Sequence, residues 1–221
     1  MSVMLKTYQE PPFCEKEILR YAGCKSYDEE LLQLLRACIK EVRGKLSYKV
    51  CYRELPVTIT EETCDFGCLT MQSQNLAKNL KDCKTAILFA ATLGVEIDRL
   101  IAKYGRISPS KALLFQAIGA ERIEALCDIF CEDMAKEKGV ALKPRFSPGY
   151  GDLSLESQKD IFQILDCFKR IGVSLNDSLL MSPSKSVTAF VGIKTYLDET
   201  EKKSVNKCAA CEKTDCQYRG V

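Results

Sequence analysis

Apolar residues recur at helical spacing in three parts of the chain. Segments 15–21 and 28–42 place apolar side chains three and four positions apart, and the second begins with an acidic first turn that suits the positive end of a helix. Segment 109–138 is largely apolar and follows Ser108-Pro109, which fits a cap and a first-turn proline. We expect three helices here, with the first two covering a sheet.

Other segments have the composition or alternation of β-strands. Segment 48–60 is rich in Val, Ile, Tyr and Thr, and its Pro56 indicates an edge or a break in the strand. Segment 85–92 is an apolar run typical of a buried strand, and 186–193 alternates apolar and polar positions. We also expect a short strand at 66–71 and helices at 73–80, 95–104 and 154–172.

The order of these elements decides between fold classes. Strands and helices do not alternate as regular βαβ units, which favours an α+β fold with a largely antiparallel twisted sheet and flanking helices over a doubly wound parallel sheet. A chain of 221 residues, 46% hydrophobic, can bury the core of one domain. We expect that domain at 1–197, with a helical N-terminal portion, and a charged linker with a cysteine-rich tail at 198–221.

Charge and composition exclude several function classes. Lys and Arg total 32 against 30 acidic residues and are dispersed, so nucleic-acid binding is not expected. The chain has no histidine, which removes Ser-His-Asp catalysis and histidine metal ligands. It shows no hydrophobic signal core and no apolar run near the ~20 residues that span a bilayer. We expect a cytoplasmic protein without membrane contact, whose 13 cysteines are mostly reduced.

One irregular segment has the features of a ligand site. The octapeptide Arg-Phe-Ser-Pro-Gly-Tyr-Gly-Asp begins at Arg145, inside a predicted loop at 139–153 that is about as long as loops usually are in compact domains. Pro148 stiffens the backbone, and Gly149 permits a turn or close approach to a ligand. The guanidinium of Arg145 suits a carboxylate, and the ring of Tyr150 suits a cation or a purine. These four residues predict a site for a zwitterionic, cationic, aromatic ligand; the alternative is a connector whose arginine pairs with a surface carboxylate.

Three motifs in order carry a resemblance to a known family. They are Arg-x-x-Pro-Gly-Tyr from Arg145, Gly-x-x-Leu-x-x-Ser within 171–178, and Met-x-Pro-x-x-Ser-Val within 181–188. Together they resemble the S-adenosylmethionine-binding activation domain of vitamin B12-dependent methionine synthase. Two positions depart from the family pattern, because Ser182 stands where tryptophan is frequent and Ser184 where the family has glycine.

The resemblance implies a function and further site residues. S-adenosylmethionine would be the ligand, with Glu121 and Glu124, and similarly Asp152, facing its amino group, although solvated carboxylates are the alternative. The chain would be a stand-alone reactivation subunit that supports reductive methylation of inactive cob(II)alamin on a partner methionine synthase, with an electron donor and no catalytic acid or base of its own. The alternative is an S-adenosylmethionine-binding or metal-containing accessory or redox protein for another corrinoid methyltransferase system.

Three cysteines near the C-terminus form a separate candidate site. Cys208 and Cys211 have the spacing of a metal-chelating turn, and Cys216 follows closely. We predict zinc or an iron–sulfur cluster here, with a fourth ligand from Cys64, Cys68, a partner or an exogenous molecule. A redox dithiol and a tail without chemistry remain alternatives.

Overall fold

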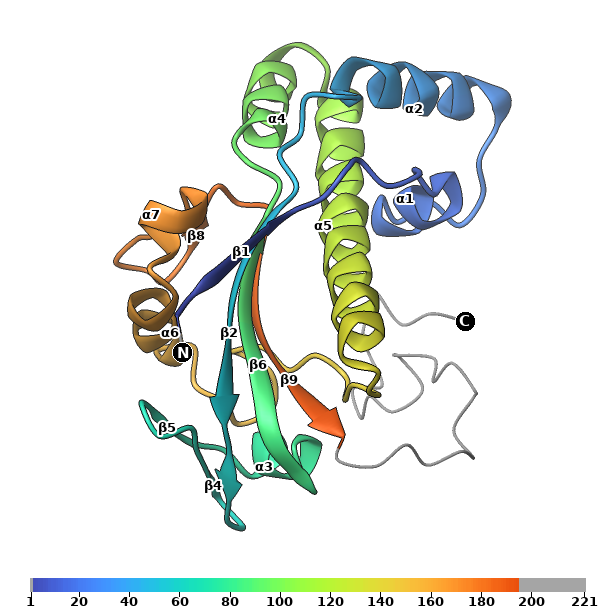
Figure 1. Cartoon of the computed structure of the whole chain (residues 1–221). Coiled ribbons are helices and arrows are strands. Elements are labelled where there is room, and N and C mark those ends of the chain that lie inside the picture. The colour runs from blue at the N-terminus through green and yellow to red at the C-terminus, as the bar shows by residue number, and fades with distance from the viewer. Residues whose placement is uncertain (1, 195–221) are drawn as a thin grey trace.

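A four-stranded antiparallel sheet forms the centre of the protein (Figure 1). The structure, a computed structural model, describes residues 2–194. Neighbouring strands all pair antiparallel, which confirms the predicted α+β fold with a largely antiparallel sheet. In spatial order the strands are β1 (Met4–Thr7), β2 (Lys49–Pro56), β6 (Cys83–Thr92) and β9 (Ser186–Lys194).

Two smaller sheets and seven helices make up the rest of the described part. One small sheet contains β3 (Thr58–Ile59), β4 (Thr63–Asp65) and β5 (Thr70–Gln72), and the other is the hairpin of β7 (Ser174–Leu175) and β8 (Met181–Ser182). The helices are α1 (Glu15–Tyr21), α2 (Glu29–Val42), α3 (Gln74–Asn79), α4 (Glu96–Ile107), α5 (Pro109–Lys138), α6 (Ser157–Leu165) and α7 (Cys167–Ile171).

The two faces of the central sheet are covered by different elements, because successive side chains of a strand point to opposite sides. On one face Ile87 and Phe89 of β6 belong to a cluster with Phe130 of α5. On the other face Leu88 and Phe190 belong to a cluster with residues of α3, α6 and α7. Figure 1 shows α5 on one side of the sheet and α6 and α7 on the opposite side.

Helices α1 and α2 do not cover the sheet, so that expectation is wrong. With α4 they pack around α5, where Ile18, Leu35, Leu100 and Phe115 share a third cluster. In Figure 1 the first two helices lie beyond α5 from the sheet. Their apolar stripes need an apolar surface, and the periodicity that reveals such a stripe does not say which surface it is.

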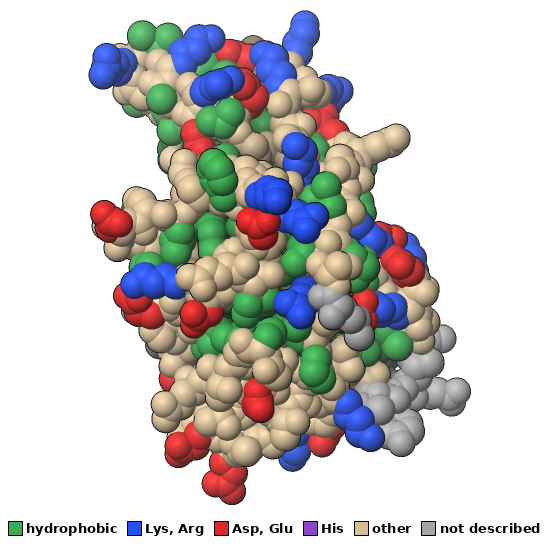
Figure 2. All heavy atoms as spheres, turned by 60° about the vertical axis from the view of Figure 1, so that its left-hand side comes forward, with side chains coloured by type: hydrophobic (Ala, Val, Ile, Leu, Met, Phe, Trp, Pro, Cys, Tyr) green, Lys and Arg blue, Asp and Glu red, His purple; other side chains and the backbone are tan. Residues whose placement is uncertain are grey.

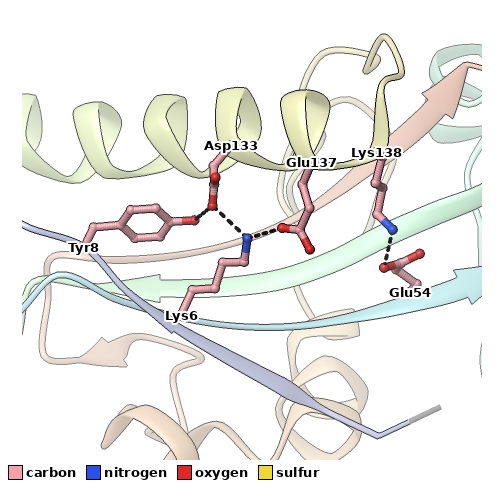
Figure 3. Close-up of polar contacts among 6 residues, drawn as sticks. All are labelled: Lys6, Tyr8, Glu54, Asp133, Glu137 and Lys138. Carbon is pink, nitrogen blue, oxygen red and sulfur yellow. Dashed lines mark hydrogen bonds and ion pairs between the residues drawn. The ribbon is translucent and has the colours of Figure 1, made fainter.

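Polar contacts fix the C-terminal half of α5 to the edge of the sheet (Figure 3). The Nζ atom of Lys6 in β1 lies 2.7 Å from Asp133 Oδ2 and 2.5 Å from Glu137 Oε2. The hydroxyl of Tyr8 donates to the same Asp133 oxygen at 2.8 Å. Beside them, Lys138 pairs with Glu54 of β2 at 2.7 Å. These contacts set the position of the long helix along the strands.

Some local boundaries differ from the expectations. The predicted helix at 154–172 starts at Ser157 and is split at Asp166, whose φ of 50° is left-handed. The segment 48–60 is broken after Pro56, beyond which the chain enters the three-stranded sheet. Strands β1, β4, β7 and β8 were not predicted, because elements of two to four residues carry little periodicity. The strand expected at 66–71 is observed only at its end, as β5.

The C-terminal tail lies outside the described residues. The predicted linker at 198–221, the boundary at 197 and the cysteine site of Cys208, Cys211 and Cys216 therefore stay predictions. Among residues 2–194, no helix combines the length and the apolar character that a membrane crossing requires.

Candidate functional site

The Pro-Gly-Tyr motif forms a tight turn. The Tyr150 N–H donates to the carbonyl of Ser147 at 3.1 Å, with Pro148 and Gly149 at the two central positions. Gly149 has a φ of 89°, so this is a turn of the type that favours proline first and glycine second. Pro148 is buried, whereas the side chain of Tyr150 is 66% exposed. The turn therefore presents an aromatic ring at the surface on a rigid base.

The segment before this turn runs along β9. Phe146 exchanges two backbone hydrogen bonds with Phe190, at 2.9 and 2.8 Å, and the Lys143 N–H donates to the carbonyl of Gly192 at 2.8 Å. In the part of the chain that the structure describes, these contacts cover β9 only from 190 onward. The earlier half, 186–189, has no such backbone partner on this side among the described residues, but its Thr188 and Ala189 are buried, at 1% and 0% exposure.

Arg145 links this segment to α5. Its Nη1 donates to Asp128 Oδ1 at 2.6 Å and its Nη2 to Glu124 Oε2 at 2.6 Å. The side chain of Arg145 is 15% exposed, against 43% for Glu124 and 46% for Asp128. Burial by itself would lower the pKa of Arg145, but neighbouring anionic groups, these carboxylates among them, raise it. Arg145, Glu124 and Asp128 thus form one charged group, in which a largely buried cation is paired with two half-exposed anions.

The surroundings of this charged group include residues that the sequence reasoning missed. Asp128 follows Glu124 at the i, i+4 spacing that puts both on one helix face, and this spacing could have indicated it. Tyr21, at the end of α1, is the second residue near the charged group that the sequence did not indicate. Burial raises the pKa of its hydroxyl, and the nearby Glu124 raises it further. No sequence signal connects Tyr21 to a residue so far along the chain.

Glu121 lies in a different environment from Glu124. It is 6% exposed, and both its carboxylate oxygens accept hydrogen bonds from Arg122, one of them from Nε at 2.5 Å. Its Oε1 also accepts from the Cys14 N–H at 3.3 Å. The carboxylate of Glu121 is thus engaged in holding the N-terminal segment on α5, and its predicted contact with a ligand stays a prediction.

Asp152 caps α3 instead of facing the charged group. Its carboxylate accepts from the Gln74 N–H at 2.8 Å and the Asn75 N–H at 3.2 Å, and from the hydroxyl of Ser73. Gly151 packs so closely that an added Cβ would lie 2.5 Å from the Asn75 side chain. These contacts fasten the end of the Pro-Gly-Tyr segment to α3 and hold the turn in place.

The cap at Asp152 predicts a pH dependence of stability. The Ser73 hydroxyl and two backbone N–H groups lower the pKa of Asp152 below its usual value of about 3.9. A lowered folded-state pKa contributes stability that is complete above the unfolded-state pKa and is lost as the pH falls through the folded-state pKa. We therefore expect the free energy of unfolding to be lower for Asp152→Asn at neutral pH, and the difference to disappear well below about pH 4.

Urea unfolding of wild type and variant from neutral pH to about pH 2 measures this difference. Asp177→Asn in the turn between β7 and β8 is the matched control, since Asp177 is also exposed and carries no capping bond. Equal pH dependence in both variants would exclude the cap as its cause.

A polar cavity lies next to the candidate site but is separate from it. It has a volume of about 700 Å³ and includes Asp152 and Ser154, but none of the six predicted ligand residues. Among residues 2–194 there is no group of three or more Cys, Asp or Glu side chains that could hold a metal ion. Of the proposed fourth ligands, Cys64 is buried and Cys68 is exposed.

Comparisons with known proteins show the family and the fold of the chain. The family model of the vitamin B12-dependent methionine synthase activation domain matches residues 72–210, which is more than half of the chain. The chain therefore belongs to this family. Among solved structures it is similar to the MetH reactivation domain bound to AdoHcy, with a TM-score of 0.66 and 12% identity, over 88% of this chain and 79% of that one. At this identity the likeness shows the shared fold. A search of curated proteins found no match.

Proposed function

We propose that the chain binds S-adenosylmethionine at the charged group of Arg145, Glu124 and Asp128. The observation that carries the proposal is the pairing of one guanidinium with two half-exposed carboxylates. An α-amino acid end can insert into such a group, because its carboxylate replaces an anion on Arg145 and its ammonium pairs with the carboxylate that is released. The charges of the ligand and of the site then balance.

The turn of Pro148, Gly149 and Tyr150 would hold the nucleoside end of the same ligand. The exposed ring of Tyr150 offers a face to a cation or a purine, worth about 0.5–2 kcal/mol for a cation. That energy alone is too small for a specific site. Backbone hydrogen bonds from the loop that carries this turn, each contributing about 1 kcal/mol, would supply more.

We propose that the bound ligand serves a cobalamin held by a partner methionine synthase, with an electron donor supplying the reduction. Membership in the activation-domain family supports this role. Exposed apolar side chains support a protein partner, since Phe168 is 74% and Leu180 62% exposed. Figure 2 shows hydrophobic side chains gathered across the middle of the face that carries α6 and α7. The chain's contribution would be positioning, because the sulfonium group is itself an activated methyl donor.

Reconstitution tests the proposed function. Inactive cobalt(II) corrinoid enzyme is mixed with a reductant and S-adenosylmethionine, with and without the chain, and methylcobalamin is followed by its absorbance. We expect methylcobalamin to form faster when the chain is present. Omission of S-adenosylmethionine is the control for reduction alone, and identical traces with and without the chain would refute the proposal.

A further inference from the structure

The charged group of Arg145, Glu124 and Asp128 carries more negative than positive charge. Its one guanidinium donates to both carboxylates, at 2.6 Å each. The nearby ion pair of Arg20 and Glu17, at 2.7 Å, adds no net charge. One positive and two negative side chains leave the group with an excess of one negative charge. This excess is a property that a bound ligand must meet.

The two carboxylates lie on opposite sides of Arg145 along α5. The segment before the Pro-Gly-Tyr turn runs antiparallel to β9, so the turn lies toward the start of that strand. Just before this start, the side chain of Lys185 packs closely on α5, because a Cβ added at Gly119 would lie 2.8 Å from its Cε atom. The direction from Asp128 to Glu124 along the helix therefore leads toward the turn. Asp128 lies one helical turn farther away.

A ligand that occupies both the turn and the charged group meets Glu124 before Asp128. Its ammonium pairs with Glu124, and its carboxylate takes the place of Glu124 at Arg145 Nη2, while Asp128 keeps its bond to Nη1. The amino-acid end of such a ligand has no net charge. The negative charge of Asp128 therefore stays uncompensated unless the ligand carries a further cation close to that end.

We propose that Asp128 makes the site selective for the sulfonium ligand S-adenosylmethionine over the neutral thioether S-adenosylhomocysteine, an inference that rests on the proposed function. The sulfonium is joined to the amino-acid end by a short methylene chain, so it lies close to the excess negative charge. Unit charges at such a separation, partly shielded by water, change a dissociation constant by about fivefold to tenfold. The thioether has the same amino-acid end and nucleoside but lacks this attraction.

Such selectivity helps the donor to replace the product. When the methyl group is transferred, the partner's reduced cobalt supplies the electron pair of the new bond, and both electrons of the broken C–S bond stay on sulfur. The sulfur thereby loses its positive charge. The neutral product binds less tightly than the donor, because Asp128 again lacks a compensating cation. The site then releases the product and accepts a new donor molecule.

Calorimetric titration of the full chain with both ligands tests this selectivity. We expect S-adenosylhomocysteine to have a dissociation constant about fivefold or more above that of S-adenosylmethionine, and Asp128→Asn to bring this ratio close to one. Both ligands share the amino-acid end, so the ratio cancels any change in Arg145 that affects them equally. The matched control is Glu132→Gln, an exposed carboxylate one helical turn beyond Asp128, which should change the ratio by less than about twofold.

Two measurements on wild type keep the inference testable if Asp128→Asn does not fold. Raising the salt concentration from about 0.05 to 0.5 M should lower the ratio, since salt screens the attraction between partly exposed charges. Sinefungin carries an amine-bearing carbon in place of the sulfonium and therefore separates the effect of charge from that of the methyl group. It should bind more tightly than S-adenosylhomocysteine.

The possible results distinguish this inference from the proposed function. If wild type does not bind S-adenosylmethionine, the proposed function is refuted and the selectivity with it. If wild type binds both ligands equally, or if the ratio is unchanged in Asp128→Asn or independent of salt, only the role of Asp128 is overturned. Sinefungin that binds no more tightly than the thioether leads to the same conclusion, because the preference would then depend on the methyl group.

Discussion

Replacing Arg145 by alanine is expected to weaken binding of S-adenosylmethionine by about 100-fold or more, since losing one member of a hydrogen-bonded charge pair costs about 2–5 kcal/mol. Without the guanidinium, the ligand's carboxylate would face Glu124 and Asp128 with no cation between them. Arg145→Lys keeps the charge but loses the planar fork, so its affinity should be intermediate. Isothermal titration calorimetry measures both effects.

A matched variant controls for general loss of charge. Arg36 also lies near two carboxylates, 3.3 Å from Glu15 and 3.7 Å from Glu29, but on the exposed surface of α2. Arg36→Ala should leave the dissociation constant unchanged. Circular dichroism and the melting temperature establish whether Arg145→Ala is folded. If a folded Arg145→Ala binds as tightly as wild type, Arg145 does not hold the ligand.

Replacing Arg122 by methionine is expected to lower the free energy of unfolding by about 3–5 kcal/mol, the range for breaking a buried charge pair. Its guanidinium is fully buried, donates to the carbonyls of Pro11 at 2.5 Å and Pro12 at 2.7 Å, and lies 4.2 Å from the ring of Phe13. The variant leaves the carbonyl of the buried Pro11 without this donor, and the buried Glu121 carboxylate with only the Cys14 N–H. Urea unfolding measures the loss, and the melting temperature should fall by about 10 °C.

Two further variants separate the possible causes of this loss. Arg99→Met removes an arginine that is 67% exposed and paired with Glu96, and it should change the free energy of unfolding by less than about 1 kcal/mol. Combining Arg122→Met with Glu121→Gln removes the unpaired buried charge and should recover part of the stability. A loss in Arg122→Met no larger than in Arg99→Met would show that the buried contacts are not stabilising.

Several elements could be predicted because their signals are local. Segment 109–138 was expected to be one helix and is observed as Pro109–Lys138, since the first-turn proline and Gly139, with a φ of 64°, mark its two ends. The turn after Ser147 was likewise indicated by its proline and glycine, which favour particular backbone angles wherever they occur. Such signals depend on a few neighbouring residues and need no tertiary contact.

The candidate site was only partly predictable. Arg145 and Glu124 were both named from the sequence, but their contact spans 21 residues, and the contribution of Asp128 was not foreseen. The carboxylates of Asp152 and Glu121 were named as candidates to face the amino group of the ligand. In the structure the carboxylate of Asp152 caps α3, and that of Glu121 binds Arg122. Residue type shows what a side chain can do. Its partner depends on which elements the fold brings together.

By itself the sequence determined the fold class, the long helix, the stiffened turn and the family, because periodicity, turn chemistry and ordered motifs are written in short segments of chain. Only the tertiary structure decided that α1 and α2 pack on α5 and that Arg122 holds Pro11 and Pro12 across 111 and 110 residues. The physical reason is that hydrophobic burial is non-directional: it requires an apolar face to be covered without specifying by what. The choice of partner follows from how all the elements pack together.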